Sequence, residues 1–437
     1  MRDALLLLFL LTALAIALRY PFVGLLTWAW FTLMTPHQLA YGVYGVPLNL
    51  VIAAATIASF LAHNGFKAAR LDATSAWMAL FSLWLVISQQ FSLDPENSAE
   101  FADRFVKTMV FALLCAQVAT DRLRLNALIW IMTLSLGYFA AKGALFTLVT
   151  LGRYRVQGIE ETILEDNNHM GIALATTLPL ILYLRDQAAR ASVRFGLVIL
   201  FVLTIIAIIG THSRGAFVSL IAFAGFFWLK SKRKGAILGA LALVLIPTVA
   251  FMPPKWIERM SSIGEAAEDA SFMGRVDAWV INAKLAADNP VTGAGLRNSY
   301  EPEIAATVDK DRATTAKAAH SIYFEVLGGA GMVGLALYLG AIASAFVTTL
   351  GLQHAARQQR APPWIGQSAY YLQIALAVFC VGGASVSLEM WDGYWLIVAM
   401  IAAMSRMATD DQHARGRALG DPHRRRWRIA SRGRAPV

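Results

Sequence analysis

The chain has 437 residues, of which 57% are hydrophobic and only 15% charged, and its mean hydropathy is +0.54. This composition excludes an ordinary soluble globular protein. The formal net charge of +10 would suggest nucleic-acid binding in a soluble protein. Here much of it lies in short connections and at the C-terminal end, where basic residues report orientation in a membrane.

Apolar runs follow one another along most of the chain, and many are long enough to cross ~30 Å of hydrocarbon as helices. They lie near 4–18, 21–36, 46–62, 73–90, 105–120, 124–150, 169–184, 194–210, 213–229, 236–252, 321–350, 366–385 and 388–405. We therefore predict an all-α polytopic membrane protein with about 12 transmembrane helices. Cys115 and Cys380 both lie inside apolar runs, so no disulfide framework is indicated.

The first two runs leave the number of spans open. Each is short for a full crossing at ~1.5 Å per residue, and Arg19-Tyr20-Pro21 joins them. Two crossings would give thirteen spans and an exterior N-terminus, whereas one broken or re-entrant unit would give twelve and a cytoplasmic one. We favour the even number, with both ends inside. A cleavable signal peptide is not expected, because no small-residue cleavage pattern follows the first run.

The connections alternate in charge and so define two sides. The basic side is cytoplasmic by the positive-inside rule, and its residues include Lys67, Arg70, Arg122, Arg124, Arg185, Arg190, Arg194, Lys230, Lys232, Arg233, Lys234, Arg357 and Arg360. The other connections face the periplasm or cell exterior, and they are 91–104, 151–168, 210–214, 253–320 and 386–393.

This sorting predicts four parts. They are transmembrane helices with short loops over 1–252, a large periplasmic loop with amphipathic helices over 253–320, C-terminal transmembrane helices over 321–405, and a basic cytoplasmic tail over 406–437. The tail is Arg-rich and carries little apolar sequence, so we expect it to be disordered and attracted to anionic lipid.

His320 lies where the long exterior segment ends and an apolar run begins. An imidazole with an unperturbed pKa near ~6.5 can accept a proton near neutral pH, which suits a general base. The alternative is a histidine that merely caps a transmembrane helix, because a boundary ionisable group raises a functional hypothesis without deciding it.

Two arginines are predicted to lie at the starts of helices on the exterior side. Arg214, within Thr211 to Ala216, falls in the first turn of a new span, where a cation suits a bound anion. Its alternative is an arginine that reaches lipid headgroups. Arg275 begins an amphipathic helix whose apolar face is Val276, Trp279, Val280, Ala283 and Ala287, and which Asn289-Pro290 ends. Gly293-Ala294-Gly295 is expected to be a plain turn.

Further cations on the exterior side could contact a diphosphate or another anionic substrate, because positive-inside bias disfavours arginines there without a ligand. They are Arg104, Lys107, Arg153, Arg155 and Arg297.

For several polar residues on the same side, the sequence allows two roles each. Glu165, Asp166 and His169 could be metal ligands, but Asp166 or Asn167 as a helix N-cap is preferred. Glu389 and Asp392 could pair with an exterior arginine or be solvated. No nucleotide-binding fingerprint is present, and we expect neither a metal site nor a cofactor.

Three ordered motifs resemble the O-antigen ligase and polymerase superfamily of bacterial envelope enzymes: THSRGAF, then GRVDAW…NPVTGAGLRNSY, then AHSIYFEVLGGAGMVGL. The N-terminal half, MRDALLLLFLL…RYPFVGLLTWAWFTLMTPHQLAYG, is similar to the branch of O-antigen or O-glycosylation ligases. The resemblance implies a metal-independent, inverting glycosyltransferase of the GT-C type in the bacterial inner membrane. Such an enzyme moves a glycan from undecaprenyl diphosphate to a sugar hydroxyl of lipid A-core, on the periplasmic face.

By the same resemblance, the essential histidine corresponds to His320 and the essential arginines to Arg214 and Arg275. The glycines Gly328, Gly329, Gly331 and Gly334 are expected to allow close helix packing beneath the site.

Three other functions stay open. A polymerase would use a second glycan as acceptor, and a protein O-oligosaccharyltransferase would use a Ser or Thr side chain. A secondary transporter of an anionic substrate could also hold arginines in broken helices, but its site would lie near the membrane midplane rather than at one face.

Overall fold

A computed structural model describes residues 2–63, 70–230, 234–261, 270–314 and 318–420. Within these ranges all regular structure is helical, which confirms the predicted all-α class. The expected disorder is wrong for the first part of the basic tail, because residues 406–420 continue the last helix, Asp392–Gly420. The tail beyond residue 420, including Arg424, lies outside the described residues.

Most apolar runs of the sequence have become helices. The first six are α1 (Arg2–Ala17), α2 (Pro21–Met34), α3 (Leu48–His63), α4 (Ala73–Gln89), α5 (Pro95–Val118) and α6 (Arg122–Val149), with the 3-10 turns η1 (Pro36–Leu39) and η2 (Tyr41–Val43) after α2. The next four are α7 (Asn167–Gln187), α8 (Ala191–Gly210), α9 (Arg214–Lys230) and α10 (Lys234–Ala250).

The segment predicted to be a large loop with helices does contain helices. They are α11 (Pro254–Ser261), α12 (Ala270–Asp288), η5 (Asn298–Tyr300), α13 (Pro302–Val308) and α14 (Lys310–Ala313). Three long helices complete the chain: α15 (Ile322–Arg357), α16 (Pro363–Gly383) and α17 (Asp392–Gly420).

Aspartates define the starts of four helices. Asp72, Asp94, Asp121 and Asp166 each accept hydrogen bonds from backbone N–H groups of the first turn of α4, α5, α6 and α7. Asp166 is therefore the N-cap of α7, as the capping alternative predicted. Asp94 with Pro95 starts α5 ten residues before the apolar run at 105, so Arg104 and Lys107 lie within a helix and not at its entrance.

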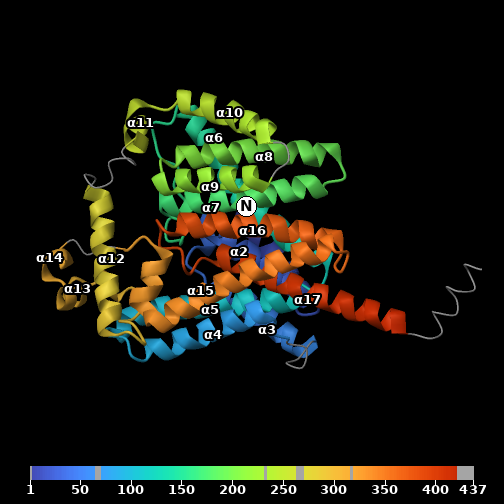
Figure 1. Cartoon of the computed structure of the whole chain (residues 1–437), viewed down its shortest axis with the longest axis horizontal. Coiled ribbons are helices and arrows are strands. Elements are labelled where there is room, and N and C mark those ends of the chain that lie inside the picture. Colours follow the sequence, from blue (N-terminus) through green and yellow to red (C-terminus); the bar gives the residue numbers. More distant parts are fainter. Residues whose placement is uncertain (1, 64–69, 231–233, 262–269, 315–317, 421–437) are drawn as a thin grey trace, which may run out of the picture.

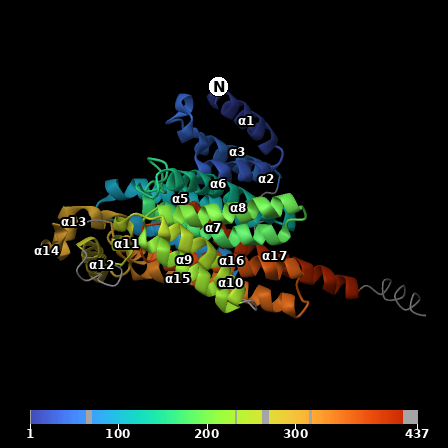
Figure 2. The same cartoon turned by 90° about the horizontal axis from the view of Figure 1, so that it is seen from above.

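The long helices run side by side, and α12 lies across one end of the bundle with α13 and α14 beyond it (Figure 1). We call this end the α12 end. Helix α17 extends from the opposite end, and α1 to α3 form a group on one side (Figures 1 and 2). The buried core is centred on α7, α16 and α17, where long runs of consecutive residues are inaccessible.

By length and composition alone, four of the described helices could cross a membrane, namely α6, α8, α15 and α16. The apolar helices α2, α3, α4 and the Arg214–Leu229 part of α9 are shorter. The chain thus has the helices of a multi-pass membrane protein, while the number of about 12 spans stays a prediction. Helices α1 and α2 are two separate helices joined at Leu18 to Tyr20.

Helix α15 is broken at Gly331, whose φ of 73° and ψ of −174° are non-helical. The loop after α12 docks on this break: Ala294 N–H donates to Gly328 O at 2.8 Å, and Met332 N–H donates to Pro290 O at 2.9 Å. A Cβ on Gly331 would lie 2.3 Å from Val291 O. Gly328 and Gly331 therefore allow the backbone of this loop to approach α15 closely. The sequence analysis expected these glycines to allow close packing of helices only.

Helix α12 differs from its prediction at its start and in its packed face. It begins at Ala270, so Arg275 lies in its second turn and not at its N-terminus. Its buried residues are Ala278, Ile281, Asn282, Leu285 and Ala286, whereas Ala283 and Ala287 are exposed. The reason is that Asn282 packs against Gly328 of α15, which centres the packed face beside the predicted one. Of the predicted face, Trp279 still contacts α15, where its ring stacks on Phe324.

Candidate functional site

Three helix starts and one turn meet at a single place. Asn167 Nδ2, at the start of α7, donates to Thr211 O just before α9 at 2.7 Å. A Cβ on Gly215 of α9 would lie 2.1 Å from Ser385 Oγ in the turn after α16, and one on Gly383 would lie 2.4 Å from Ile322, the first residue of α15. We call this place the helix-start junction.

His320 lies directly before α15 at this junction. It is half-buried, its φ is 45°, and its Nδ1 is buried without a hydrogen-bond partner in the described part of the chain. Burial lowers the pKa of His320 to about 4, with further lowering from Arg275 and His169, against the opposing effect of Glu325 and Asp166. The imidazole is therefore neutral at neutral pH, with a pKa well below the value of ~6.5 expected from the sequence.

Of the two predicted arginines, Arg275 is close enough to His320 to disfavour its protonation. Arg214 is the first residue of α9, as predicted. Arg214 and Arg275 are both half-buried, and both interact with other residues of the protein. The structure thus brings Arg275 to His320 and places Arg214 at the helix-start junction.

Arg297 forms a buried ion-pair cluster with two glutamates. Its Nη2 lies 2.6 Å from Glu389 Oε1 and its Nη1 lies 3.3 Å from Glu325 Oε1. Burial opposes ionisation of Arg297, but Glu325 and Glu389 outweigh it and raise the pKa of Arg297. Burial raises the pKa of Glu389 to about 7, against the lowering by Arg297, and Glu325 adds to the increase. The expected pairing of the last exterior turn with an arginine is thus observed at Glu389.

Glu325 is a site residue that the sequence reading missed. It is 3% exposed, and it follows His320 by five positions in the first turn of α15. The available signal was an ionisable residue inside an otherwise apolar run, which by itself indicates a functional or paired group.

His169, in the first turn of α7, was considered from the sequence only as a possible metal ligand. Its Nδ1 lies 2.8 Å from Ile163 O, and its Nε2 is buried without a partner among the residues described. Asp166 is engaged in capping α7. In the described ranges no group of three or more His, Cys, Asp or Glu side chains is arranged to hold a metal ion.

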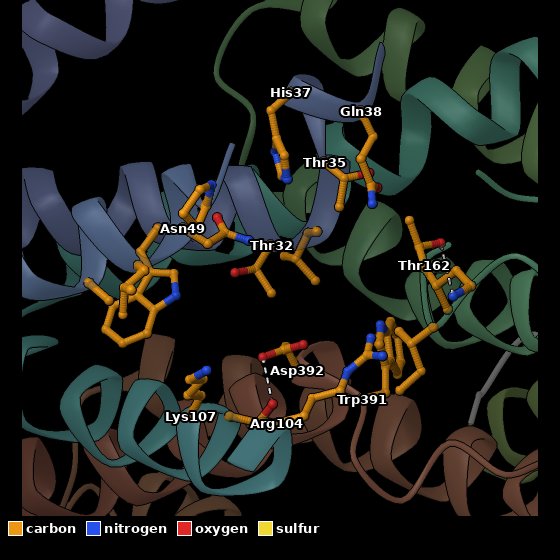
Figure 3. A pocket seen from close by; sticks show the side chains of 18 of the residues that line it. Thr32, Thr35, His37, Gln38, Asn49, Arg104, Lys107, Thr162, Trp391 and Asp392 are labelled. Carbon is orange, nitrogen blue, oxygen red and sulfur yellow. Dashed lines mark hydrogen bonds between the residues drawn. The ribbon is translucent and has the colours of Figure 1, made fainter. Parts of the chain in front are cut away.

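A cavity of about 620 Å³ lies beside the junction, and we call it the α2–α5 cavity (Figure 3). Its lining is mostly apolar and comes from α2, α3, α5, the 159–164 loop and the turn before α17. Figure 3 shows His37 and Gln38 on one side, with Arg104, Lys107 and Asp392 on the other.

The polar groups of the cavity differ in their partners. Lys107 pairs with Asp103, and Thr108 Oγ1 donates to Asp392 at 2.9 Å. Arg104 lowers the pKa of Glu389 slightly against burial, so the cavity wall lies within electrostatic reach of the Arg297 cluster. The backbone of Ile163, which binds His169, also belongs to the cavity lining.

Arg153 and Arg155 are exposed in the connection between α6 and α7. Gly152 beside them packs against Met252, at the end of α10. No contact found in the described ranges brings either arginine to His320.

Two family models match the chain. Residues 1–190 match a family of unknown function (DUF5935), and residues 199–339 match the family described as O-Antigen ligase. Residues 199–339 belong to the O-antigen ligase/polymerase superfamily. The match supports a membrane enzyme of the ligase or polymerase type, with a lipid-linked glycan as substrate. No curated protein matches the chain.

Proposed function

We propose that this protein is an O-antigen ligase that transfers a glycan from undecaprenyl diphosphate to a sugar hydroxyl of lipid A-core. The reaction takes place at the α12 end, on the periplasmic face of the inner membrane. It is metal-independent and inverts the anomeric centre.

One observation carries the proposal. His320, Arg214 and Arg275 all fall inside residues 199–339, the segment that matches the O-antigen ligase family. They come from three separate elements, and a neutral, half-buried imidazole with Arg275 nearby combines a proton acceptor with a cation.

In the proposed reaction His320 removes the proton of the acceptor hydroxyl as that oxygen attacks the anomeric carbon. The new glycosidic bond forms while the bond from the anomeric carbon to the diphosphate oxygen breaks. The proton remains on the imidazole, and the electron pair leaves with the diphosphate. A neutral imidazole is required at the start, and the lowered pKa of His320 supplies it.

The leaving diphosphate gains a negative charge, which cations at the site stabilise. Arg275 and Arg214 are assigned this role, because guanidinium groups make bidentate, charge-assisted bonds to phosphate oxygens. Arg214 also stands at a helix start, where the dipole favours an anion. Arg153 and Arg155, exposed in their loop, are assigned at most initial attraction of the donor.

The α2–α5 cavity is proposed to hold the part of the donor next to the diphosphate. Its apolar lining suits isoprenoid carbon atoms, and Arg104 and Lys107 at its edge suit a charged headgroup. Arg297, whose guanidinium already contacts Glu325 and Glu389, is assigned a structural role in place of diphosphate binding.

The test uses purified protein, an undecaprenyl-diphosphate glycan, and three acceptors in parallel: lipid A-core, free glycan, and a Ser/Thr peptide. Glycosylation of lipid A-core alone supports a ligase. Exclusive use of free glycan or peptide would replace it by a polymerase or a protein O-oligosaccharyltransferase. Activity should survive EDTA, and inhibition that Mg²⁺ or Ca²⁺ reverses would contradict the metal-independent mechanism.

A further inference from the structure

The backbone of Ala319, the residue directly before His320, is held from two sides. Its carbonyl oxygen accepts a hydrogen bond from Trp279 Nε1 at 2.7 Å, and its N–H donates to Glu325 Oε1 at 3.0 Å. Trp279 belongs to α12 and Glu325 to the first turn of α15. The backbone of Ala319 is therefore fixed on both sides of its Cα, between the large loop and the helix that follows the histidine. We call Glu325 and Trp279 the Ala319 clamp.

Both members of the clamp are immobilised by other contacts. Glu325 Oε1 also accepts hydrogen bonds from Ser387 Oγ at 2.6 Å and Tyr300 OH at 2.7 Å, besides its ion pair with Arg297. The carboxylate thus draws together η5, the turn before α17 and the start of α15. The indole ring of Trp279 stacks on Phe324, with ring centroids 5.3 Å apart and planes 6° apart.

The backbone of His320 needs such support. Its φ of 45° is in the left-handed region, which side-chain-bearing residues adopt unfavourably. A residue stays in that region only where its surroundings hold it there. Among the described residues, the polar contacts on the backbone of Ala319 are the two of the Ala319 clamp.

We propose that Glu325 is a positioning residue for His320: through the N–H of Ala319, and together with Trp279, it holds the histidine backbone in its left-handed conformation and so aims the imidazole. This inference rests on the proposed function, in which His320 is the general base. Without the clamp, the backbone at His320 relaxes and the imidazole moves away from the acceptor hydroxyl. A misplacement of ~1 Å lowers a rate by about 100-fold.

The kinetic test compares Glu325→Ala, Glu325→Gln and the exposed control Glu303→Ala in the purified protein. Glu325→Ala should lower kcat by about 100-fold with little change in the KM of the lipid-linked donor. Glu325→Gln keeps an oxygen acceptor for the Ala319 N–H, so it should recover most of the activity. Glu303→Ala should behave as wild type, because Glu303 is exposed on α13.

A second readout does not depend on glycan transfer. The rate at which diethyl pyrocarbonate modifies His320, followed by mass spectrometry, should change in Glu325→Ala and in Trp279→Phe, which keeps the aromatic ring but loses the N–H donor. It should stay unchanged in Glu303→Ala. If wild-type protein transfers glycan to no acceptor, the proposed function fails, while this rate still tests the clamp.

The outcomes decide the proposal in both directions. Wild-type kcat and wild-type His320 modification in Glu325→Ala overturn it. A loss in Glu325→Gln as large as that in Glu325→Ala also overturns it, because charge and not the hydrogen bond would then matter. If Glu325→Ala does not fold, Trp279→Phe provides the same test, and a double variant should be no worse than the stronger single one.

Discussion

The His320 region and the α2–α5 cavity lie side by side but differ in how their polar groups are partnered. Near His320, a single oxygen of Glu325 is contacted by four donor groups, from Ala319, Ser387, Tyr300 and Arg297, and this network surrounds a His320 Nδ1 that has no partner among the described residues. In the cavity, His37 Nδ1, Gln38 Oε1 and Asn49 Oδ1 are buried without hydrogen-bond partners in the part of the chain described.

This difference suits the His320 region to catalysis and the α2–α5 cavity to binding of the donor. A densely bonded network holds reacting groups in one geometry, as stabilisation of a transition state requires. A roomy cavity with unsatisfied polar atoms is suited to a ligand that completes those bonds. Changes near His320 should therefore lower kcat, whereas changes in the cavity should raise the KM of the donor.

The largest effect is expected at His320. His320→Ala should lower glycan transfer by about 10³-fold, because general base catalysis contributes on the order of 10²–10⁴. The measurement is initial-rate transfer to lipid A-core by purified protein. His354→Ala is the matched control, since His354 is exposed near the other end of α15. Near-normal transfer by His320→Ala would remove the base assignment.

Arg275→Ala should lower kcat by about 10²-fold, because it removes a cation from the developing charge of the diphosphate. Arg312→Gln is the control on the same loop. Arg312 is exposed and pairs with Asp277 at 3.0 Å and Asp309 at 2.8 Å, and such surface pairs contribute only about 0–1 kcal/mol. Equal rates in both variants would show that Arg275 does not act on the leaving group.

The double substitution Arg104→Gln with Lys107→Gln should raise the KM of the donor by about tenfold, which corresponds to ~1.4 kcal/mol. The value of kcat should change little, because neither residue is assigned to the reacting atoms. The double variant Arg190→Gln with Arg194→Gln, on exposed residues at the start of α8, is the charge-matched control. A fall in kcat with an unchanged KM would move these residues from the cavity to the chemistry.

The sequence predicted what depends on local pattern. Continuous apolar runs locate most of the bundle helices, because burial of an apolar helix is visible in a few consecutive turns. The start of α9 at Arg214 and the end of α12 before Asn289 were also predictable from short signals. Alternating loop charge placed Arg275 and His320 in one connection, and in the structure Arg275 is within electrostatic reach of His320.

What the sequence did not predict depends on residues far apart in the chain. Glu325 meets Ser387, and Arg297 meets Glu389, across 62 and 92 positions. The packed face of α12 is set by a close approach to Gly328, which no hydrophobic period encodes. The α2–α5 cavity is lined by residues from several elements, so no single segment of the sequence indicates that it exists.

The smallest effect expected is a difference in pH dependence, and it distinguishes a lowered pKa of His320 from an ordinary one. With a pKa of about 4, only about 3% of the imidazole is protonated at pH 5.5, against about nine-tenths for an unperturbed pKa of ~6.5. Because the lowered pKa keeps the base neutral, kcat/KM should fall little between pH 7 and 5.5. Arg275→Gln removes the charged group that lowers the pKa of His320 most, so the acid limb of this variant should move to higher pH. Burial raises the pKa of Glu389 to about 7, so this carboxyl could also contribute to the pH dependence of kcat/KM. Measuring the pH profile of Glu389→Gln separates that contribution from the contribution of His320. An acid limb near pH 6.5 in both wild type and Arg275→Gln would contradict the lowered pKa. It would mean that the imidazole of His320 is more exposed to water than in this structure.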